Sequence, residues 1–523
     1  MPEEELTLRL AKPKKKGLLR IIFSRLFLIL LLMLVQVSLI MSVYGWFKEY
    51  IPHFTGLQIA FTFVMVLYLF GNSMDSSAKL TWMMLISLFP VPGTIFLAFT
   101  QTNLGHRAVK TRIEQLIDDT MTAIIQKKEV MERLESDPSG TDDLCTYVNR
   151  TGCFPIFDNT EVTYFPIGEK KFEALLEELR KAEHYIFMEY FIIEEGYMWG
   201  RILKLLSEKA AAGVDVRVMY DGMCEISLLP HDYPKRMERL GIKCKAFSPI
   251  LPFLSTHYNY RDHRKILVID GKVAFNGGVN LADEYINRKE RFGHWKDAAL
   301  MLKGDAARSF ALMFLQMWSI NDPGPVFDKY VHMPVPKQEH AAGYVMPYGD
   351  CPLDGNRVGE NVYIDILSRA TDYVYIMTPY LILDGELEAA LKFAALRGVD
   401  VRIILPGIPD KKMAYALAKS HYKTLIRADV KIYEYVPGFV HSKVFVSDDQ
   451  KAVVGTINLD YRSLYHHFEC ATYLYQTECI GEIRQDFEET LTKCRKVTPE
   501  TIRNEKLYYK LMGSLMKLIA PLM

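Results

Sequence analysis

The chain lacks an excess of charge of either sign. Its 523 residues include 63 lysines and arginines against 63 aspartates and glutamates. Proteins that bind nucleic acid usually have a strongly basic domain, because they neutralise phosphates along the strand. The balanced charge therefore argues against nucleic acid as a partner.

Cysteine is scarce and follows no pattern. The eight cysteines are scattered along the chain, with no CxxC pair and no short regular spacing. A disulfide framework or a zinc site needs such spacing. We therefore expect reduced thiols and no bound metal.

Long apolar runs, in contrast, fill the first hundred residues. The run from Ile21 to Tyr44 is long enough to cross a bilayer, the run from Leu57 to Phe70 is shorter, and a third spans Leu80 to Thr100. A cleavable signal peptide is disfavoured, because the first run is too long and more apolar runs follow it. We predict a transmembrane anchor of two or three helices over residues 21–100, after a basic tail over residues 1–20.

Basic residues stand on both sides of these runs. They favour the cytoplasm at the amino terminus and, more weakly, after residue 105. Three full spans cannot satisfy both preferences, so the number of spans stays open. We expect a multi-pass protein of the cell membrane with its catalytic domains on the cytoplasmic face.

The rest of the chain repeats itself. From about residue 160 strand and helix patterns alternate, which predicts a largely parallel sheet flanked by helices. IFMEYFI at 186–192 returns as IMTPYLI at 376–382. A period this long indicates a duplicated domain rather than a solenoid. We predict two α/β domains related by a pseudo-twofold axis, with a connecting helix before them and a tail after them, at 101–140 (helix), 141–325 (first domain), 326–500 (second domain) and 501–523 (tail).

The longest match between the copies contains polar residues within a strand. HRKILVIDGKVAFNGGVNL, from His263, aligns without gaps with HSKVFVSDDQKAVVGTINL, from His441. Because side chains alternate along a strand, His263 and Lys265 share a face, and so do His441 and Lys443. If the domains meet about a twofold axis, two imidazoles and two ammonium groups can converge on one site.

Such a site suits a phosphodiester. One histidine can attack phosphorus while the other protonates the departing alkoxide and later deprotonates the incoming hydroxyl. The lysines neutralise the non-bridging oxygens. Glycines that admit phosphate and side chains that bond its oxygens follow at the same offsets in both copies: Gly277, Gly278 and Asn280, and Gly455, Thr456 and Asn458.

Asp270 and Asp448 end the apolar strands that begin at His263 and His441. Each lies seven residues after its histidine, so on a continuous strand it faces away from the site. Taken from the residues alone, the two aspartates are predicted to lie in turns and to stabilise local structure.

The paired HxKxxxxD motifs resemble the phospholipase D superfamily. YNYRDHRKILVIDGKVAFNGGVNLADEYIN and PGFVHSKVFVSDDQKAVVGTINLDYRS look like its bacterial cardiolipin synthase branch. The resemblance implies two phospholipase D-like α/β/α domains that convert two phosphatidylglycerol molecules to cardiolipin and glycerol, without nucleotide, metal or other cofactor. It implies as catalytic residues His263, Lys265, Asp270, His441, Lys443 and Asp448.

The resemblance also suggests roles within this set. His263 is expected as the nucleophile that forms a phosphohistidine, and His441 as the acid and base. A downstream carboxylate is expected to orient each ring, Asp297 in HWKD and Glu469 in HHFEC. Gly278 departs from the hydroxyl residue common at this position, so one phosphate donor is missing in the first copy.

The carboxyl-terminal KLYYKLMGSLMKLIAPLM alternates apolar clusters with lysines. This pattern suits a helix in the headgroup region of a membrane, and equally a helix packed on the core. With the anchor at the other end, we expect membrane association, with phosphatidylglycerol and membrane lipid as partners. The oligomeric state stays open, a homo-oligomer included.

Three other functions compete with the synthase. A membrane phospholipase D-type hydrolase, or a phosphatidyltransferase with another alcohol acceptor, shares the first half of the mechanism. A nuclease of the same superfamily conflicts with the neutral charge and the anchor. A lipid-binding scaffold without activity has little need for two His/Lys sets.

Overall fold

The computed structural model describes most of the chain beyond the first apolar run. The described residues are 7–11, 34–35, 37–39, 41–42, 45–46, 54–72, 74–101, 104–249, 260–322 and 324–522. Most of the predicted first span, 21–44, lies outside them.

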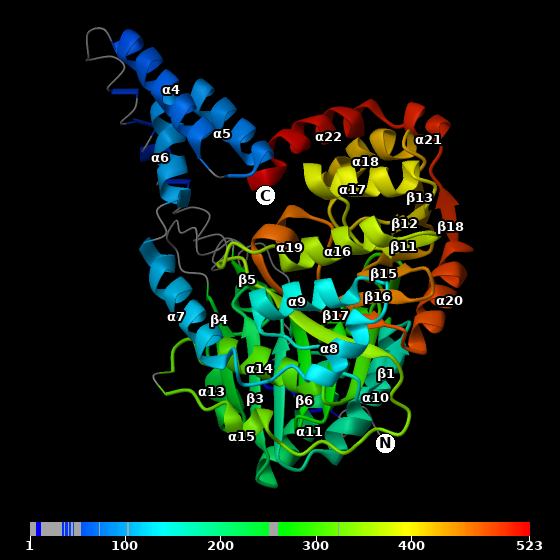
Figure 1. The fold of residues 1–523 in the computed structure, drawn as a ribbon. Helices are drawn as coiled ribbons and strands as arrows, with labels where there is room; N and C mark the ends of the chain where they lie inside the picture. Colours follow the sequence, from blue (N-terminus) through cyan, green and yellow to red (C-terminus); the bar gives the residue numbers. More distant parts are fainter. Residues whose placement is uncertain are drawn as a thin grey trace.

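Two large mixed sheets form the centre of the molecule (Figure 1). The first follows the order β1-β9-β7-β6-β2-β3-β4. Its strands are β1 (Thr160–Phe165), β2 (Tyr185–Tyr190), β3 (Asp215–Asp221), β4 (Lys243–Phe247), β6 (Lys265–Ile269), β7 (Val273–Gly277) and β9 (Ala299–Gly304).

The second sheet repeats this arrangement. Its main path is β10-β17-β16-β15-β11-β12-β13-β18, so seven strands follow the same order as in the first sheet and β18 is added at the edge. The strands are β10 (Tyr344–Asp350), β11 (Tyr373–Met377), β12 (Asp400–Pro406), β13 (Lys431–Tyr435), β15 (Val444–Ser447), β16 (Lys451–Gly455), β17 (His467–Tyr475) and β18 (Cys494–Lys496).

In each sheet two strand pairs are parallel and the remaining pairs of the common order are antiparallel. β2 pairs in parallel with β3, and β3 with β4, whereas β6, β7 and β9 run antiparallel to their neighbours. The prediction of two duplicated α/β units is thus confirmed at the level of the fold, although the sheets are more antiparallel than the alternation of patterns suggested. The reason is that each HxK segment forms a hairpin, β6–β7 or β15–β16, instead of crossing over through a helix.

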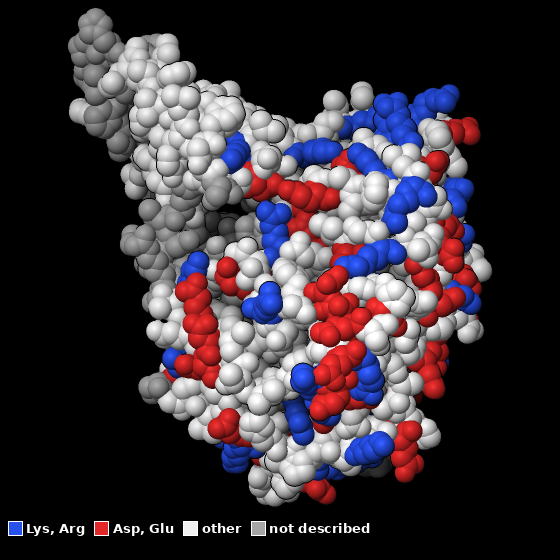
Figure 2. Space-filling model, viewed as in Figure 1, with Lys and Arg blue, Asp and Glu red and all other residues white. Residues whose placement is uncertain are grey.

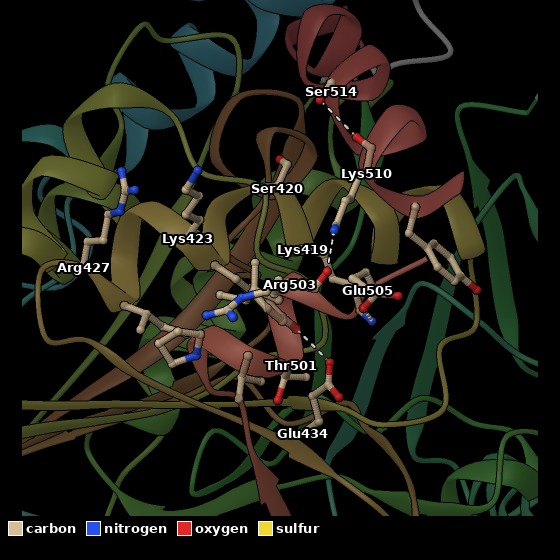
Figure 3. A pocket seen from close by; sticks show the side chains of 16 residues that line it. Lys419, Ser420, Lys423, Arg427, Glu434, Thr501, Arg503, Glu505, Lys510 and Ser514 are labelled. Atoms are coloured by element: carbon tan, nitrogen blue, oxygen red, sulfur yellow. Dashed lines mark hydrogen bonds and ion pairs between the residues drawn. The ribbon is translucent and has the colours of Figure 1, made fainter. Parts of the chain in front are cut away.

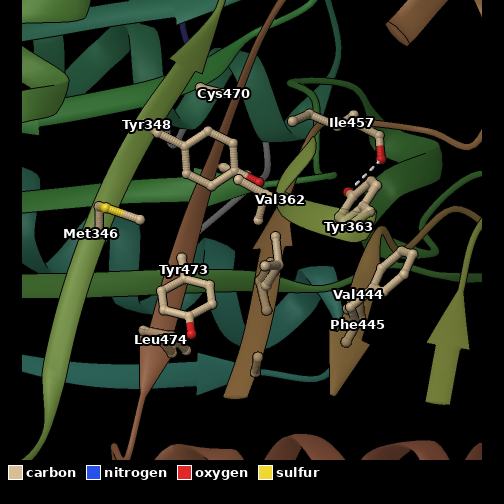
Figure 4. Close-up of a cluster of buried hydrophobic side chains, with 14 of the residues drawn as sticks. Met346, Tyr348, Val362, Tyr363, Val444, Phe445, Ile457, Cys470, Tyr473 and Leu474 are labelled. Carbon is tan, nitrogen blue, oxygen red and sulfur yellow. Dashed lines mark hydrogen bonds between the residues drawn. The ribbon is translucent and has the colours of Figure 1, made fainter. Parts of the chain in front are cut away.

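A continuous apolar core joins the two halves. Helix α14 (Ala307–Trp318) packs on β2, β6 and β7 of the first sheet and on β10 of the second. In the second half, Tyr363 of α16 (Val358–Arg369) stacks on Phe445 with ring centroids 4.0 Å apart, and its hydroxyl donates to the Ile457 carbonyl (Figure 4). This packing fixes β15, the strand that follows His441 and Lys443.

The described amino-terminal helices form a separate apolar cluster. α4 (Phe54–Gly71), α5 (Ser76–Leu88) and α6 (Pro90–Gln101) pack together around Leu69, Trp82, Ile86 and Leu97. Among the residues that the structure describes, no helix combines the length and the apolar character that crossing a membrane requires.

The boundary predicted at residue 141 differs from the structure. α9 (Thr141–Gly152) packs on β10 and α16 of the second half, and the Asn361 amide donates to the Tyr147 hydroxyl at 2.7 Å. The first sheet begins only at β1. The predicted connecting region 101–140 contains two helices, α7 (Leu104–Thr120) and α8 (Lys128–Glu135), instead of one. Their short apolar faces pack on a core that the sequence alone does not place beside them.

Candidate active site

Each HxK segment is positioned by the backbone of the opposite half. β5 (Arg261–Asp262) pairs with the start of β17, and the His263 amide donates to the Phe468 carbonyl at 2.9 Å. β14 (Gly438–Val440) pairs with β8 (His294–Lys296), and the His441 amide donates to the Lys296 carbonyl at 2.7 Å. The two histidines therefore lie where the halves meet.

The carboxylates cross between the halves. Nδ1 of His263 lies 2.9 Å from both oxygens of Glu469, which belongs to the second half. Nδ1 of His441 lies 2.7 Å from Oδ2 of Asp297, which belongs to the first. An ionised carboxylate only accepts hydrogen bonds, so each Nδ1 carries a proton and each Nε2 is left with a lone pair.

Burial sets the charge of these groups. It lowers the pKa of His263 well below its usual value and that of His441 to about 4. Burial alone would raise the carboxylate pKa values, but the imidazole beside each one outweighs it and lowers the pKa of Asp297 and of Glu469. The site thus contains two neutral rings, each held by an ionised carboxylate.

Both lysines are buried beside the histidines. The Lys265 ammonium donates to the His263 carbonyl, and the Lys443 ammonium donates to the His441 carbonyl and lies 3.0 Å from its Nδ1. Burial lowers the pKa of Lys265 to about 8 and that of Lys443 to about 7. The charge of Lys265 also lowers the pKa values of His441 and Lys443, which shows that the two sets act on one another.

The residues after the hairpins support the carboxylates. The Thr456 hydroxyl donates to Oε2 of Glu469 and lies 3.0 Å from the Cys470 carbonyl. At the matching position, a Cβ on Gly278 would come within 2.0 Å of Oδ1 of Asp297. The missing hydroxyl in the first copy therefore leaves room for the shorter carboxylate. The preceding glycines, Gly277 and Gly455, lie against the strand that carries that carboxylate, where a Cβ would come within 2.5 Å of the backbone.

The two asparagines differ. Oδ1 of Asn280 accepts from the Ile192 amide at 3.1 Å, and its Nδ2 donates to the Tyr285 hydroxyl at 2.8 Å. Asn458 is buried, and its Oδ1 has no hydrogen-bond partner among the described residues. Asn280 thus orders the wall of the site, whereas the Oδ1 of Asn458 can still accept a hydrogen bond from a donor such as a hydroxyl group.

Asp270 and Asp448 lie outside the group around the histidines. Both have a positive φ in the hairpin turn. Asp270 accepts from the amides of residues 183–185 and Asp448 from those of residues 371–373, at 2.8–3.0 Å. These contacts lie at the start of β2 and β11 and agree with the predicted turn, while the catalytic role that the resemblance implies stays a prediction. The strand direction explains this position, because it takes both carboxylates to the far end of the sheet.

A third histidine, which the sequence analysis did not select, lies beside the first. The ring of His467 is 5.3 Å from that of His263, and its Nδ1 is 3.6 Å from Oε1 of Glu469. Both ring nitrogens are buried without a hydrogen-bond partner among the described residues. Its position two residues before the carboxylate, matching Trp295 before Asp297, is the signal that could have revealed it. Trp295 packs on His441 at 5.4 Å.

Two clusters have ligand atoms close enough for a metal ion among the described residues: His263, His467 and Glu469, and Glu360, Asp384 and Glu386. In the first, the Nδ1 proton of His263 already occupies the space between the ring and Glu469. A cation there would take the place of the proton that holds the ring.

The comparisons with known proteins agree with this geometry. The family described as "Cardiolipin synthase, PLD-like domain" matches residues 175–318 and 363–491, one segment in each half. An uncharacterized protein of Streptococcus mutans is 57% identical over 88% of this chain and 99% of its own. The cardiolipin synthase of Halalkalibacterium halodurans is 31% identical over 96% of this chain and 100% of its own.

A solved structure shows the same fold. The phosphatidylserine synthase of Haemophilus influenzae aligns with a TM-score of 0.53 at 15% identity, over 69% of this chain and 93% of that one. The duplicated sheets and the crossed histidine–carboxylate pairs define a phospholipase D-like protein. The chain belongs to the cardiolipin synthase family of these proteins.

Proposed function

We propose that this protein is a phosphatidyltransferase that makes cardiolipin and glycerol from two molecules of phosphatidylglycerol. The crossed pairing of the two HxK histidines with carboxylates of the opposite half carries the proposal. It provides two imidazoles in a defined tautomer, related by a pseudo-twofold axis, at the seam of the duplicated units. A phosphodiester between them meets a nucleophile on one side and a proton donor on the other.

The reaction runs in two steps. Nε2 of His441 takes up a proton when the anionic phosphodiester binds. Nε2 of His263 then attacks phosphorus, the P–O bond to glycerol breaks, and Nε2 of His441 gives this proton to the departing alkoxide. His441 then takes the proton of a hydroxyl on a second phosphatidylglycerol, whose oxygen displaces His263 from phosphorus. Bound phosphodiester raises the pKa of His441, because an anion beside the ring favours its charged form.

Lys265 and Lys443 neutralise the two non-bridging oxygens as charge builds in each step. Glu469 and Asp297 stabilise the positive charge that each ring carries during the cycle. Asp270 and Asp448 have no part in this sequence.

Aromatic rings around the histidines favour transfer over hydrolysis. Phe191 lies 4.9 Å from the His263 ring, and Tyr285 and Phe439 lie 5.5 and 5.9 Å from that of His441. Such walls disfavour water beside the phosphohistidine and accept a lipid-borne hydroxyl instead. A hydrolase of the same fold has no need to exclude water.

Incubation of the purified protein with phosphatidylglycerol alone tests the proposal. We expect equal amounts of cardiolipin and free glycerol, measured by mass spectrometry and an enzymatic glycerol assay. Phosphatidic acid as the main product would identify a hydrolase, and no lipid product at all would refute the proposal. The His263→Ala protein serves as the inactive control.

The contacts on either side of the predicted anchor also bear on membrane attachment. The Leu8 amide donates to the Gly200 carbonyl at 3.0 Å, and the Arg236 guanidinium donates to the Leu10 carbonyl at 2.7 Å. α7 returns to the same body, where Arg112 donates to the Asp322 carbonyl at 2.6 Å. The segments on both sides of residues 12–103 therefore contact the catalytic units.

These contacts favour an even number of membrane passages between residues 11 and 104. A two-span anchor would reconcile the basic residues on both of its sides with a cytoplasmic location of both. Reporters fused to the amino and carboxyl termini of the full chain would then be accessible from the same side of the membrane. Accessibility from opposite sides would contradict an even number of spans.

A further inference from the structure

A cavity far from the histidines in the chain has the character of a second lipid site. It has a volume of about 700 Å³ and lies between three helices of the second half: α18 (Lys412–Ile426), α21 (Pro499–Arg503) and α22 (Leu507–Ile519). Volumes of this size are typical of sites for small ligands. Lysine and arginine side chains gather over these helices at the upper right of Figure 2.

The lining has an excess of positive charge. Five of its side chains are cations and two are carboxylates. Glu505 is paired with Lys419, and Glu434 is bonded to Arg495 and to the Tyr415 and Tyr422 hydroxyls. The acidic groups are thus already occupied by partners of their own.

Three of the cations have no salt-bridge or hydrogen-bond partner among the residues that the structure describes. They are Lys423 on α18, Arg427 directly after it and Arg503 on α21, and Figure 3 shows all three around the cavity. Guanidinium groups match phosphate oxygens in charge and in geometry. Three unpaired cations around one cavity therefore select a phosphate-bearing anion.

One wall of the cavity belongs to an amphipathic helix. Lys510 and Ser514 of α22 face the cavity, while Gly513 and Met516 pack on the second half. At about 100° per residue, a third face lies next to the cavity side. It consists of large apolar side chains that are 41–69% exposed: Leu507, Tyr508, Leu511, Leu515 and Leu518.

This apolar face continues onto the amino-terminal helices. The Thr81 hydroxyl of α5 donates to the Leu518 carbonyl at 2.7 Å, and the neighbouring Leu80 is 67% exposed. The protrusion of α4–α6 is almost free of charged side chains in Figure 2. Cations in a cavity beside a continuous apolar surface match a phospholipid, whose phosphate and acyl chains are joined in one molecule.

We propose that the cavity between α18, α21 and α22 binds the headgroup of an anionic glycerophospholipid, with its acyl chains along the exposed face of α22. This site is separate from the catalytic histidines. It rests on the proposed function only in that both place the protein on a phospholipid membrane. Its role is to hold the catalytic units on anionic membranes.

Partition onto vesicles tests the site. The full chain with His263→Ala, which cannot turn lipid over, is mixed with phosphatidylcholine vesicles with and without phosphatidic acid. Replacing Lys423, Arg427 and Arg503 by glutamine lowers the partition coefficient onto the anionic vesicles by about 100-fold. Partition onto pure phosphatidylcholine is unchanged.

A matched variant controls for net charge. Lys170, Arg180 and Arg239 are exposed and lie in or next to α10 (Gly168–Lys181) and α13 (Tyr233–Glu238), at the opposite end of Figure 1. Their replacement by glutamine removes the same three charges and leaves the partition coefficient close to that of the parent. Equal loss in both triple variants would overturn the site in favour of a general charge effect.

Soluble phosphate separates the two sources of a phosphate group. We expect glycerol phosphate to bind the protein at least ten-fold more weakly than a short-chain phosphatidic acid does, because glycerol phosphate leaves the α22 face uncovered. Equal affinity would overturn the lipid assignment. The cavity variant without His263→Ala retains cardiolipin formation in detergent micelles, so failure of the catalytic proposal and failure of this site give different results.

Discussion

The two halves have the same strand order, but their catalytic histidine candidates, His263 and His441, contact different residues. His263 is held by both oxygens of Glu469, which Thr456 supports, and packs on the polar ring of His467. His441 is held by one oxygen of Asp297 and packs on Trp295. Neither half contains both members of a pair, so each half completes the histidine–carboxylate pair of the other.

The largest effect is expected from the histidines themselves. His263→Ala and His441→Ala each reduce turnover of phosphatidylglycerol by about 10⁴-fold, because the nucleophile or the acid is lost. A phosphatidyl ester of p-nitrophenol distinguishes them, because this leaving group departs without a proton donor. His441→Ala releases one equivalent of p-nitrophenol in a burst and His263→Ala releases none. The reverse pattern would assign the nucleophile to His441.

The lysines come next. Lys265→Met and Lys443→Met each lower kcat/KM by about 10³-fold, since one phosphate oxygen loses its cation. In the wild type, burial lowers the pKa of Lys265 to about 8 and that of Lys443 to about 7 in the free enzyme, whose ionisation kcat/KM reports. The charged form disappears above its pKa, so kcat/KM falls as pH rises through 7 to 8. A kcat/KM that is flat across this range would contradict the assignment.

The crossed carboxylates give a sharper test of the comparison. Glu469→Gln slows the p-nitrophenol burst by about 100-fold, as expected for a residue that acts on the nucleophile of the other half. Asp297→Asn leaves the burst rate nearly unchanged and slows steady turnover by about 100-fold. Glu482→Gln, an exposed residue on α20 (Cys479–Leu491), is the control. An exchanged pattern would mean that each carboxylate serves its own half.

His467 has a smaller expected effect. His467→Phe keeps a ring against His263 but removes the nitrogen beside Glu469. We expect kcat to change by less than about ten-fold, with the acid limb of the pH profile displaced upward, because the charge of His467 lowers the pKa of His263. A protein that only loses stability, with an unshifted pH profile, would show that the ring has a packing role alone.

Substitution of the turn aspartates, Asp270 and Asp448, is expected to change turnover least. Asp270→Asn replaces one of the two acceptor oxygens by an NH2 group that cannot accept from the backbone amides and costs about 1–3 kcal/mol, while Asp448→Asn costs less because Asp448 is half-buried. Thermal denaturation followed by fluorescence checks this order. Turnover of the folded variants stays within about three-fold of wild type. A loss comparable to that of the lysine variants would restore a catalytic role.

The sequence predicted the residues of the candidate site more completely than it predicted the helices around them. Alternation along a strand placed His263 and Lys265 on one face, and the gapless repeat gave their counterparts, because these relations are local. α9 escaped prediction, since its apolar face is compatible with either half. The motif by itself did not place Asp270 and Asp448, because it records spacing and not the end of the strand at which a side chain lies.

The sequence by itself determined the duplication, the two His/Lys sets and the chemistry they permit, because these follow from residue type and from the period of a strand. Only the tertiary structure decided that Glu469 holds His263 and Asp297 holds His441, and that His467 lies beside His263. These partners lie 206, 144 and 204 residues apart in the chain, and no local pattern links them. Their contact arises from the packing of one sheet against the other.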